Sequence, residues 1–160
     1  MSGSTSTGGL SPEELAYYAD GAWYDAEYAL VRADIPYYAG VAERTRGPIL
    51  ELACGTGRLT IPMAIAGSRV LGLDFAPAMI AEANKKRAHL GPEVQARLRF
   101  VIDDMRNARL GERFDAVVLA FNTLMHMTAD EDLDAVLEAV RAHLAPGGLF
   151  YFDIQTPHPG

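Results

Sequence analysis

The stretch "ILELACGTGRLT", residues 49–60, joins a short apolar run to a turn made of small residues. Residues 49–53 are apolar apart from Glu51, which is typical of a strand covered on both faces of a sheet. Residues 54–57 include two glycines, which permit a sharp turn and let a ligand approach the main chain closely. A helix predicted over residues 58–66 would offer free N–H groups to a carboxylate or phosphate. The alternative is a tight turn that binds nothing, and two glycines alone do not decide between them.

Four further apolar runs have the composition of buried strands; they are residues 69–74, 98–102, 114–121 and 149–154. Helical patterns lie between them, over residues 77–89 and 130–144, and Gly147-Gly148 is expected to end the second. Strands that alternate with helices predict an α/β fold, a doubly wound and mainly parallel sheet with helices on both faces.

The N-terminal part has a different composition. Residues 1–10 are rich in Gly, Ser and Thr, which predicts disorder. Ser11-Pro12 followed by two acids is typical of a helix start. Residues 11–46 are expected to form a cap of short helices, with a restart near Asp34 and Pro36, and residues 47–156 to form the main domain.

Composition and charge disfavour several classes of partner. The 160 residues are 49% hydrophobic and 22% charged, which suits one globular domain. A net charge of −7, with Lys85-Lys86-Arg87 as the one basic run, disfavours nucleic acid. No apolar run approaches the roughly 18 residues that cross a bilayer, so no membrane partner is expected. The single cysteine and the lack of an apolar signal segment favour a cytoplasmic location.

Acidic residues stand at the ends of the next two predicted strands. Asp74 ends the second, where a carboxylate can accept hydrogen bonds from both hydroxyls of a ribose. Asp103, Asp104 and Met105 end the third, where a carboxylate and an apolar surface suit a purine. The alternatives are a helix N-cap for Asp74 and a solvated turn for the paired acids. Because carboxyl ends of parallel strands meet at one edge, the combination favours a nucleoside site.

Taken together, these motifs resemble the class I S-adenosylmethionine-dependent methyltransferases, and are most similar to those that act on small molecules. "ELACGTG" resembles the family's acidic glycine-rich loop, and "VLGLDFAPAMI" and "FVIDDMRNARLGERFD" its second and third motifs. "FDAVVLAFNTLMHM" and "LAPGGLFYFDI" are similar to the fourth and fifth strands with their adjoining loops. The resemblance implies a Rossmann-like fold, S-adenosylmethionine as cofactor, no metal, and methyl transfer to an N or O nucleophile of a small molecule.

The resemblance also implies roles for the residues of the first loop. Ala53, Gly55 and Gly57 would lie against the methionyl part of the cofactor, with Glu51 near its amino group. Cys54 belongs to the same loop, where small size explains it better than nucleophilic chemistry. Ala53 departs from the family pattern by replacing the first glycine of the loop with a residue one methyl larger.

Further roles fall on the second and third motifs. Asp74 would hold the ribose hydroxyls, and Phe75 and Met79 would border the adenosine. Asp104 would accept a hydrogen bond from the adenine amine, while the main chain of Met105 contacts the ring edge.

The remaining roles concern the methionyl end and the methyl acceptor. Phe121 would flank the methionyl chain, and Tyr24, with Tyr28 as a weaker candidate, would reach the cofactor carboxylate; the alternative for both tyrosines is helix packing. His126 is the candidate general base and Asn122 the candidate for orienting the acceptor. A packed or helix-start histidine is the alternative for His126.

Two other functions fit part of the pattern. A nicotinamide-dependent oxidoreductase also needs a glycine loop and a ribose acid, but Thr60 stands where its third glycine is expected. The other function is a cofactor-binding module without catalysis. The family's sheet has seven strands and this chain supplies five, so much of the substrate pocket would be missing. The resemblance therefore implies a C-terminally truncated form, or a homodimer completed through the exposed fifth strand.

Overall fold

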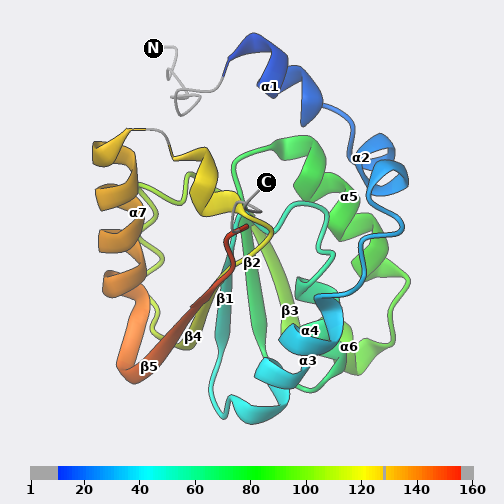
Figure 1. Cartoon of the computed structure of the whole chain (residues 1–160). Helices are drawn as coiled ribbons and strands as arrows, with labels where there is room; N and C mark the ends of the chain where they lie inside the picture. The colour runs from blue at the N-terminus through cyan, green and yellow to red at the C-terminus, as the bar shows by residue number, and fades with distance from the viewer. Residues whose placement is uncertain (1–10, 128, 156–160) are drawn as a thin grey trace, which may run out of the picture.

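The computed structural model describes residues 11–127 and 129–155. Five parallel strands form one sheet in the order β3-β2-β1-β4-β5 (Figure 1). They are β1 (Ile49–Leu52), β2 (Val70–Asp74), β3 (Leu98–Ile102), β4 (Phe114–Leu119) and β5 (Leu144–Phe152). The order reverses between β1 and β4, so the crevice beyond these two strand ends is where such sheets bind ligands.

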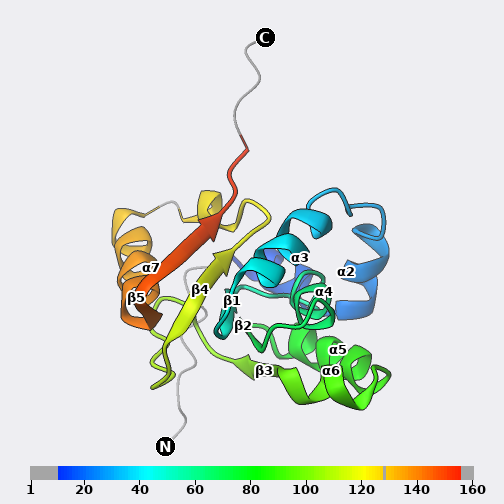
Figure 2. The ribbon, with the colours of Figure 1, turned by 90° about the horizontal axis from the view of Figure 1, so that it is seen from below.

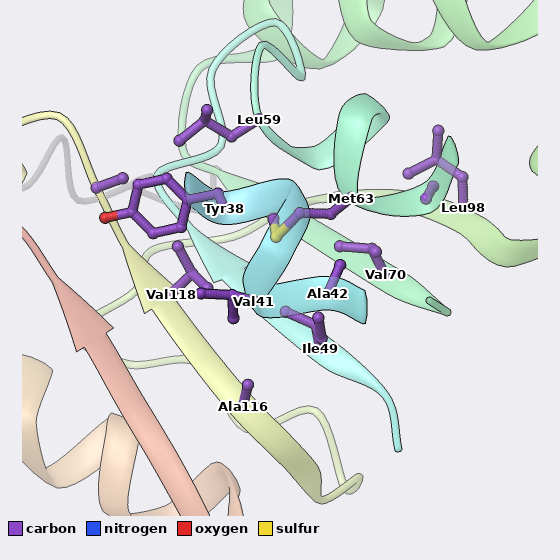
Figure 3. Close-up of a cluster of buried hydrophobic side chains, with 12 residues drawn as sticks. Tyr38, Val41, Ala42, Ile49, Leu59, Met63, Val70, Leu98, Ala116 and Val118 are labelled. Atoms are coloured by element: carbon purple, nitrogen blue, oxygen red, sulfur yellow. The ribbon is translucent and has the colours of Figure 1, made fainter. Parts of the chain in front are cut away.

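Alternate residues of the strands face two apolar clusters, one on each side of the sheet. Ile49 packs with Val41 of α3 (Ile35–Arg44) and Met63 of α4 (Thr60–Ile65) (Figure 3). Leu50 packs on the opposite face with Val136 of α7 (Asp130–His143). Figure 2 shows α7 on one side of the sheet and α3 and α4 on the other. The predicted sheet with helices on both faces is confirmed.

The helices α5 (Pro77–Ala88) and α6 (Pro92–Arg97) connect β2 to β3. Two short helices, α1 (Pro12–Tyr17) and α2 (Gly21–Glu27), precede α3 and lie near the end of the sheet where the strands finish (Figure 1). The helix start predicted at Ser11 is confirmed, because its hydroxyl accepts from the N–H of Glu14 and its own N–H donates to the Glu14 carboxylate. The disorder predicted for residues 1–10 concerns residues outside those described.

Three predictions of local structure were wrong in detail. The glycine pair Gly147-Gly148 does not end α7, which ends at His143. Both glycines lie within β5, where the register jumps from Phe114↔Leu144 to Ala116↔Leu149. The extra residues of β5 at this point form a bulge-like irregularity. Gly147 lies in it with a left-handed φ of 77°, which glycine adopts readily. The helix α6 was not predicted, and β4 ends at Leu119 rather than at 121.

Gly72 provides a test of the packing beneath the site. A Cβ added there would lie 2.8 Å from both Cys54 Sγ and Phe100 Cδ1. Because these neighbours are packed around a central strand, we expect Gly72→Ala to lower the free energy of unfolding by about 1–3 kcal/mol in urea denaturation. The control is Gly40→Ala in α3, where a Cβ meets only the tip of Arg44. Gly40→Ala should raise the free energy of unfolding by about 0.5–1 kcal/mol. Equal losses of stability in both variants would contradict the close packing around Gly72.

No helix in the described part of the chain has the length and apolarity needed to span a membrane.

Candidate active site

A cavity of about 910 Å³ lies at the carboxyl ends of the strands, under the aromatic side chains of α1 and α2. Every cofactor residue predicted from the sequence lines it except Gly57; they are Tyr24, Glu51, Ala53, Cys54, Gly55, Asp74, Phe75, Met79, Asp104, Met105 and Phe121. The candidate Asn122 lines it as well. Four different strand ends therefore converge on one space. The residues alone predicted three of them, and the resemblance added the end of β4 through Phe121.

The glycine-rich loop forms the floor of this cavity through an unusual backbone path. Three of its residues have left-handed φ angles: Ala53 (53°), Gly55 (55°) and Gly57 (83°). Ala53 thus adopts a conformation that glycine takes up more readily than alanine does. Gly57 is not among the lining residues; a Cβ there would lie 3.0 Å from the ring of Phe100, so close packing requires this glycine.

Asp74 connects the end of β2 to the glycine loop. One carboxylate oxygen accepts from the N–H of Gly55 at 2.8 Å, and the other accepts from the N–H of Ala76 at 2.9 Å. Burial raises the pKa of this carboxyl, and the backbone hydrogen bonds oppose that rise. Each oxygen can accept a further hydrogen bond, so the group can order the loop and bind a ligand hydroxyl at the same time. Ala76, not Asp74, is the N-cap of α5.

Glu51 is a second buried carboxyl at the base of the cavity, with 3% of its surface exposed. Its carboxylate accepts from the hydroxyl of Thr60 at 2.5 Å. Burial raises its pKa to about 8, although Thr60 and the nearby charge of Arg58 act in the opposite direction. None of the described residues forms an ion pair with this carboxyl. It is therefore suited to a positively charged ligand group, which would favour its ionised form.

The end of β3 supplies an acidic and apolar edge. Asp104 is held by Arg106, whose Nη2 lies 2.6 Å from a carboxylate oxygen, and Arg106 also contacts Asp132 of α7 at 2.7 Å. This arginine lowers the pKa of Asp104 although burial acts to raise it. Met105 lines the cavity beside them. Asp104 is therefore an ionised acceptor whose position is fixed.

The chain leaves β4 through two consecutive residues with left-handed backbones, Phe121 (φ 62°) and Asn122 (φ 57°). Both line the cavity. Left-handed conformations of non-glycine residues are uncommon and cluster at functional sites. The candidate base His126 belongs to the 3-10 helix η1 (Thr123–His126), and its side chain lies outside those described.

Aromatic side chains of α1 and α2 cover the cavity. The rings of Tyr24 and Tyr28 lie 4.7 Å apart, and Tyr28 contacts Phe121 edge-on at 5.1 Å. Tyr18 contacts Phe75 at 5.6 Å, which joins α1 to the second motif. Burial raises the pKa of Tyr24, so its hydroxyl stays protonated and can donate a hydrogen bond.

Arg58 lines the cavity directly after the glycine loop and was missed among the predicted site residues. Its guanidinium forms a bidentate pair with Asp34, at 2.6 and 2.7 Å, and lies 4.8 Å from the centre of the Phe121 ring. A single arginine in a helical pattern carries no signal of this, because its partners are distant in sequence.

Asp25 was also missed, and it fastens α2 to the rest of the site. Its carboxylate accepts from the hydroxyl of Thr56 in the glycine loop and pairs with Lys86 of α5 at 2.8 Å. Both charged side chains are about one-third exposed, so the ion pair itself contributes little. Thr56, in contrast, is buried. If Asp25 were replaced by a residue without an acceptor, the Thr56 hydroxyl would be left buried without a hydrogen bond, which is costly.

We expect Asp25→Ala to loosen α2 while the sheet stays intact, because alanine removes the oxygen that accepts from the Thr56 hydroxyl. A local loss of about 1 kcal/mol corresponds to roughly fivefold faster amide exchange in α2. Hydrogen–deuterium exchange of α2 and of β1 in the same sample measures this. The matched control, Lys85→Gln, removes an exposed pair with Glu82 and should leave exchange in α2 unchanged. Unchanged exchange in the Asp25 variant would contradict the fastening role.

The sheet has parallel strands in this order, a glycine-rich loop after β1 and acids after β2 and β3. This is the architecture of α/β proteins that bind nucleoside-containing ligands at the switch point of the sheet. The sequence profile described as "Methyltransferase domain" matches residues 49–148, which is more than half of the chain. The chain belongs to this methyltransferase domain family.

Individual relatives agree with this placement. The chain is 33% identical over 125 residues to dTDP-3-amino-3,6-dideoxy-alpha-D-glucopyranose N,N-dimethyltransferase of Streptomyces fradiae, a match that covers 76% of this chain and 41% of that protein. The glycopeptide N-methyltransferase MtfA, solved with (S)-adenosyl-L-methionine, is 31% identical with a TM-score of 0.68, over 84% of this chain and 54% of MtfA.

DhpI, solved as a complex with SAM and HEP, is also 31% identical; its TM-score is 0.71, over 91% of this chain and 65% of DhpI. The chain spans about two-fifths of the length of several curated relatives that it matches.

Proposed function

We propose that this protein is an S-adenosylmethionine-dependent methyltransferase that acts on an N or O nucleophile of a small molecule. The observation that carries the proposal is the convergence of the glycine loop, Glu51, Asp74 and Asp104 on one cavity. Relatives that methylate small molecules, and solved relatives that contain S-adenosylmethionine, support the proposal further.

The chemistry of the cavity suits this cofactor. Within the described part of the chain, Asp74 accepts hydrogen bonds from the backbone N–H groups of Gly55 and Ala76, and it has lone pairs left for the two ribose hydroxyls. Asp104 and the Met105 main chain would bind the adenine, with Phe75 and Met79 beside the adenosine. Glu51 would attract the ammonium group of the methionyl part, and Tyr24 would donate to its carboxylate.

When bound, S-adenosylmethionine supplies an activated methyl group on a positively charged sulfur. The residues of this chain then contribute mainly alignment, since a sulfonium needs little further activation. Phe121 would flank the methionyl chain, and Asn122 would orient the acceptor. His126 remains our candidate for the base that removes a proton from the acceptor.

Calorimetric titration tests the proposal with S-adenosylhomocysteine and NAD as competing ligands. We expect saturable binding of S-adenosylhomocysteine and none of NAD at the same concentrations. Binding of NAD alone would contradict the proposal and favour the oxidoreductase alternative. Methyl transfer to small amines and phenols, followed by mass spectrometry, then distinguishes N from O acceptors.

The proposal includes a cytoplasmic location and pairing of two copies along the edge of β5. The single cysteine supports the first. Leu149 and Phe152, each more than half exposed on this edge strand, support the second. Sedimentation equilibrium tests the pairing, and a monomer at all concentrations would contradict it.

A further inference from the structure

Asp153, directly after β5, is the common acceptor for three hydrogen bonds from two other parts of the chain. One carboxylate oxygen accepts from the N–H of Phe121 at 3.0 Å and from the hydroxyl of Tyr38 at 2.8 Å. The other oxygen accepts from the N–H of Asn122 at 2.7 Å. The carboxylate thus links α3, the loop after β4 and the end of β5.

Two of these donors belong to the strained turn that follows β4. Phe121 and Asn122 hold left-handed backbones although neither is glycine. Such a conformation persists only where surrounding interactions favour it. The pair of N–H groups aimed at one carboxylate is an interaction of this kind, because hydrogen bonds to an ionised acceptor are stronger than those between neutral groups.

The turn lies between two hollows. Phe121 lines the 910 Å³ cavity. It also lines a second hollow of about 420 Å³, together with Tyr38 and Asp153. On the cavity side, the ring of Phe121 contacts Arg58 and Tyr28. Asp153 lines the smaller hollow and not the larger cavity, so it contacts the turn from the side away from the larger cavity.

We propose that Asp153 is a positioning residue, which fixes Phe121 and Asn122 where they contact the part of the ligand beyond the adenosine. This inference rests on the proposed function, which places adenosine against β2 and β3. Asp153 acts through the two backbone N–H groups and does not touch the ligand itself. Replacing Asp153 should therefore weaken the contacts to the methionyl end of the ligand and leave the contacts to the adenosine end unchanged.

Comparison of two ligands tests this selectivity. We expect Asp153→Asn to weaken S-adenosylhomocysteine binding by at least tenfold, because an amide nitrogen cannot accept the hydrogen bond that the lost oxygen accepted. Adenosine binding should stay within twofold of the unsubstituted protein. Calorimetry on the whole chain measures both affinities, and faster exchange of the Phe121 and Asn122 amides provides a second measurement.

The matched control is Tyr38→Phe, which removes the third hydrogen bond and leaves both backbone bonds to Asp153. It should leave both affinities within twofold. If Asp153→Asn does not fold, Asp153→Glu replaces it with the same expected selectivity, since it keeps the charge and displaces the oxygens by one methylene. Equal loss of both ligands, or no loss of either, in the folded variant would overturn the inference. Failure of the unsubstituted protein to bind S-adenosylhomocysteine would overturn the proposed function and this inference with it.

Discussion

Replacing Asp74 by alanine should weaken the binding of S-adenosylhomocysteine by about 100-fold, or about 3 kcal/mol. The variant loses the acceptor for the ligand's ribose hydroxyls. It also leaves the N–H groups of Gly55 and Ala76 without the partner they have at 2.8 and 2.9 Å, so the glycine loop loses order. Calorimetric titration at neutral pH measures the change. Asp74→Asn should be less severe, because one acceptor oxygen remains.

Asp134→Ala is the control for the change in net charge. Asp134 is exposed on α7 and does not line the cavity. This variant should bind S-adenosylhomocysteine as the unsubstituted protein does. If Asp74→Ala folds and its affinity stays within twofold, the ribose role of Asp74 is wrong.

Glu51→Gln should change how stability depends on pH. The pKa of the Glu51 carboxyl is about 8 in the folded protein against 4.5 in the reference state. Between these values the folded state keeps a proton that the unfolded state has released, so the contribution of Glu51 to stability falls as pH rises. Glutamine does not titrate. Its advantage over glutamate should therefore grow between pH 4.5 and pH 8 to an amount on the order of 5 kcal/mol.

Urea denaturation of both proteins at intervals from pH 5 to pH 9 measures this difference. Glu138→Gln, on the exposed face of α7, is the control and should show no such trend. Parallel stability curves for the unsubstituted protein and Glu51→Gln would contradict a raised pKa.

The same carboxyl links ligand affinity to pH. The ammonium group of S-adenosylhomocysteine should favour the ionised form of Glu51, so binding releases a proton when Glu51 is initially protonated. Affinity should then increase between pH 6 and pH 8 in the unsubstituted protein and not in Glu51→Gln. Calorimetry in buffers with different ionisation enthalpies counts the released protons.

The sequence was sufficient for the parts of the site that depend on local pattern. Ile49 and Leu50 alternate between the two apolar clusters, and strand ends in a parallel sheet meet at one edge, so Asp74 and Asp104 could be placed together in advance. The family resemblance added Glu51. The chain order of the motifs then indicated the family.

Contacts between distant segments could not be predicted in this way. Arg58 pairs with Asp34, Asp25 contacts Thr56, and Asp153 accepts from Phe121, and in each case the two residues are far apart in sequence. No periodicity or spacing marks such a pair.

The end of α7 was mispredicted for a related reason. Gly147-Gly148 is a good helix-ending signal, but pairing with β4 recruits the preceding residues from Leu144 into β5. Tertiary strand pairing here outweighed a local preference.

A crystal structure with S-adenosylhomocysteine bound would show whether the strand ends form one cofactor site. We expect adenine beside Met105, both ribose hydroxyls on Asp74 and the amino group near Glu51. Density for the ligand at any other place, or an empty cavity in crystals grown at saturating ligand, would contradict such a site.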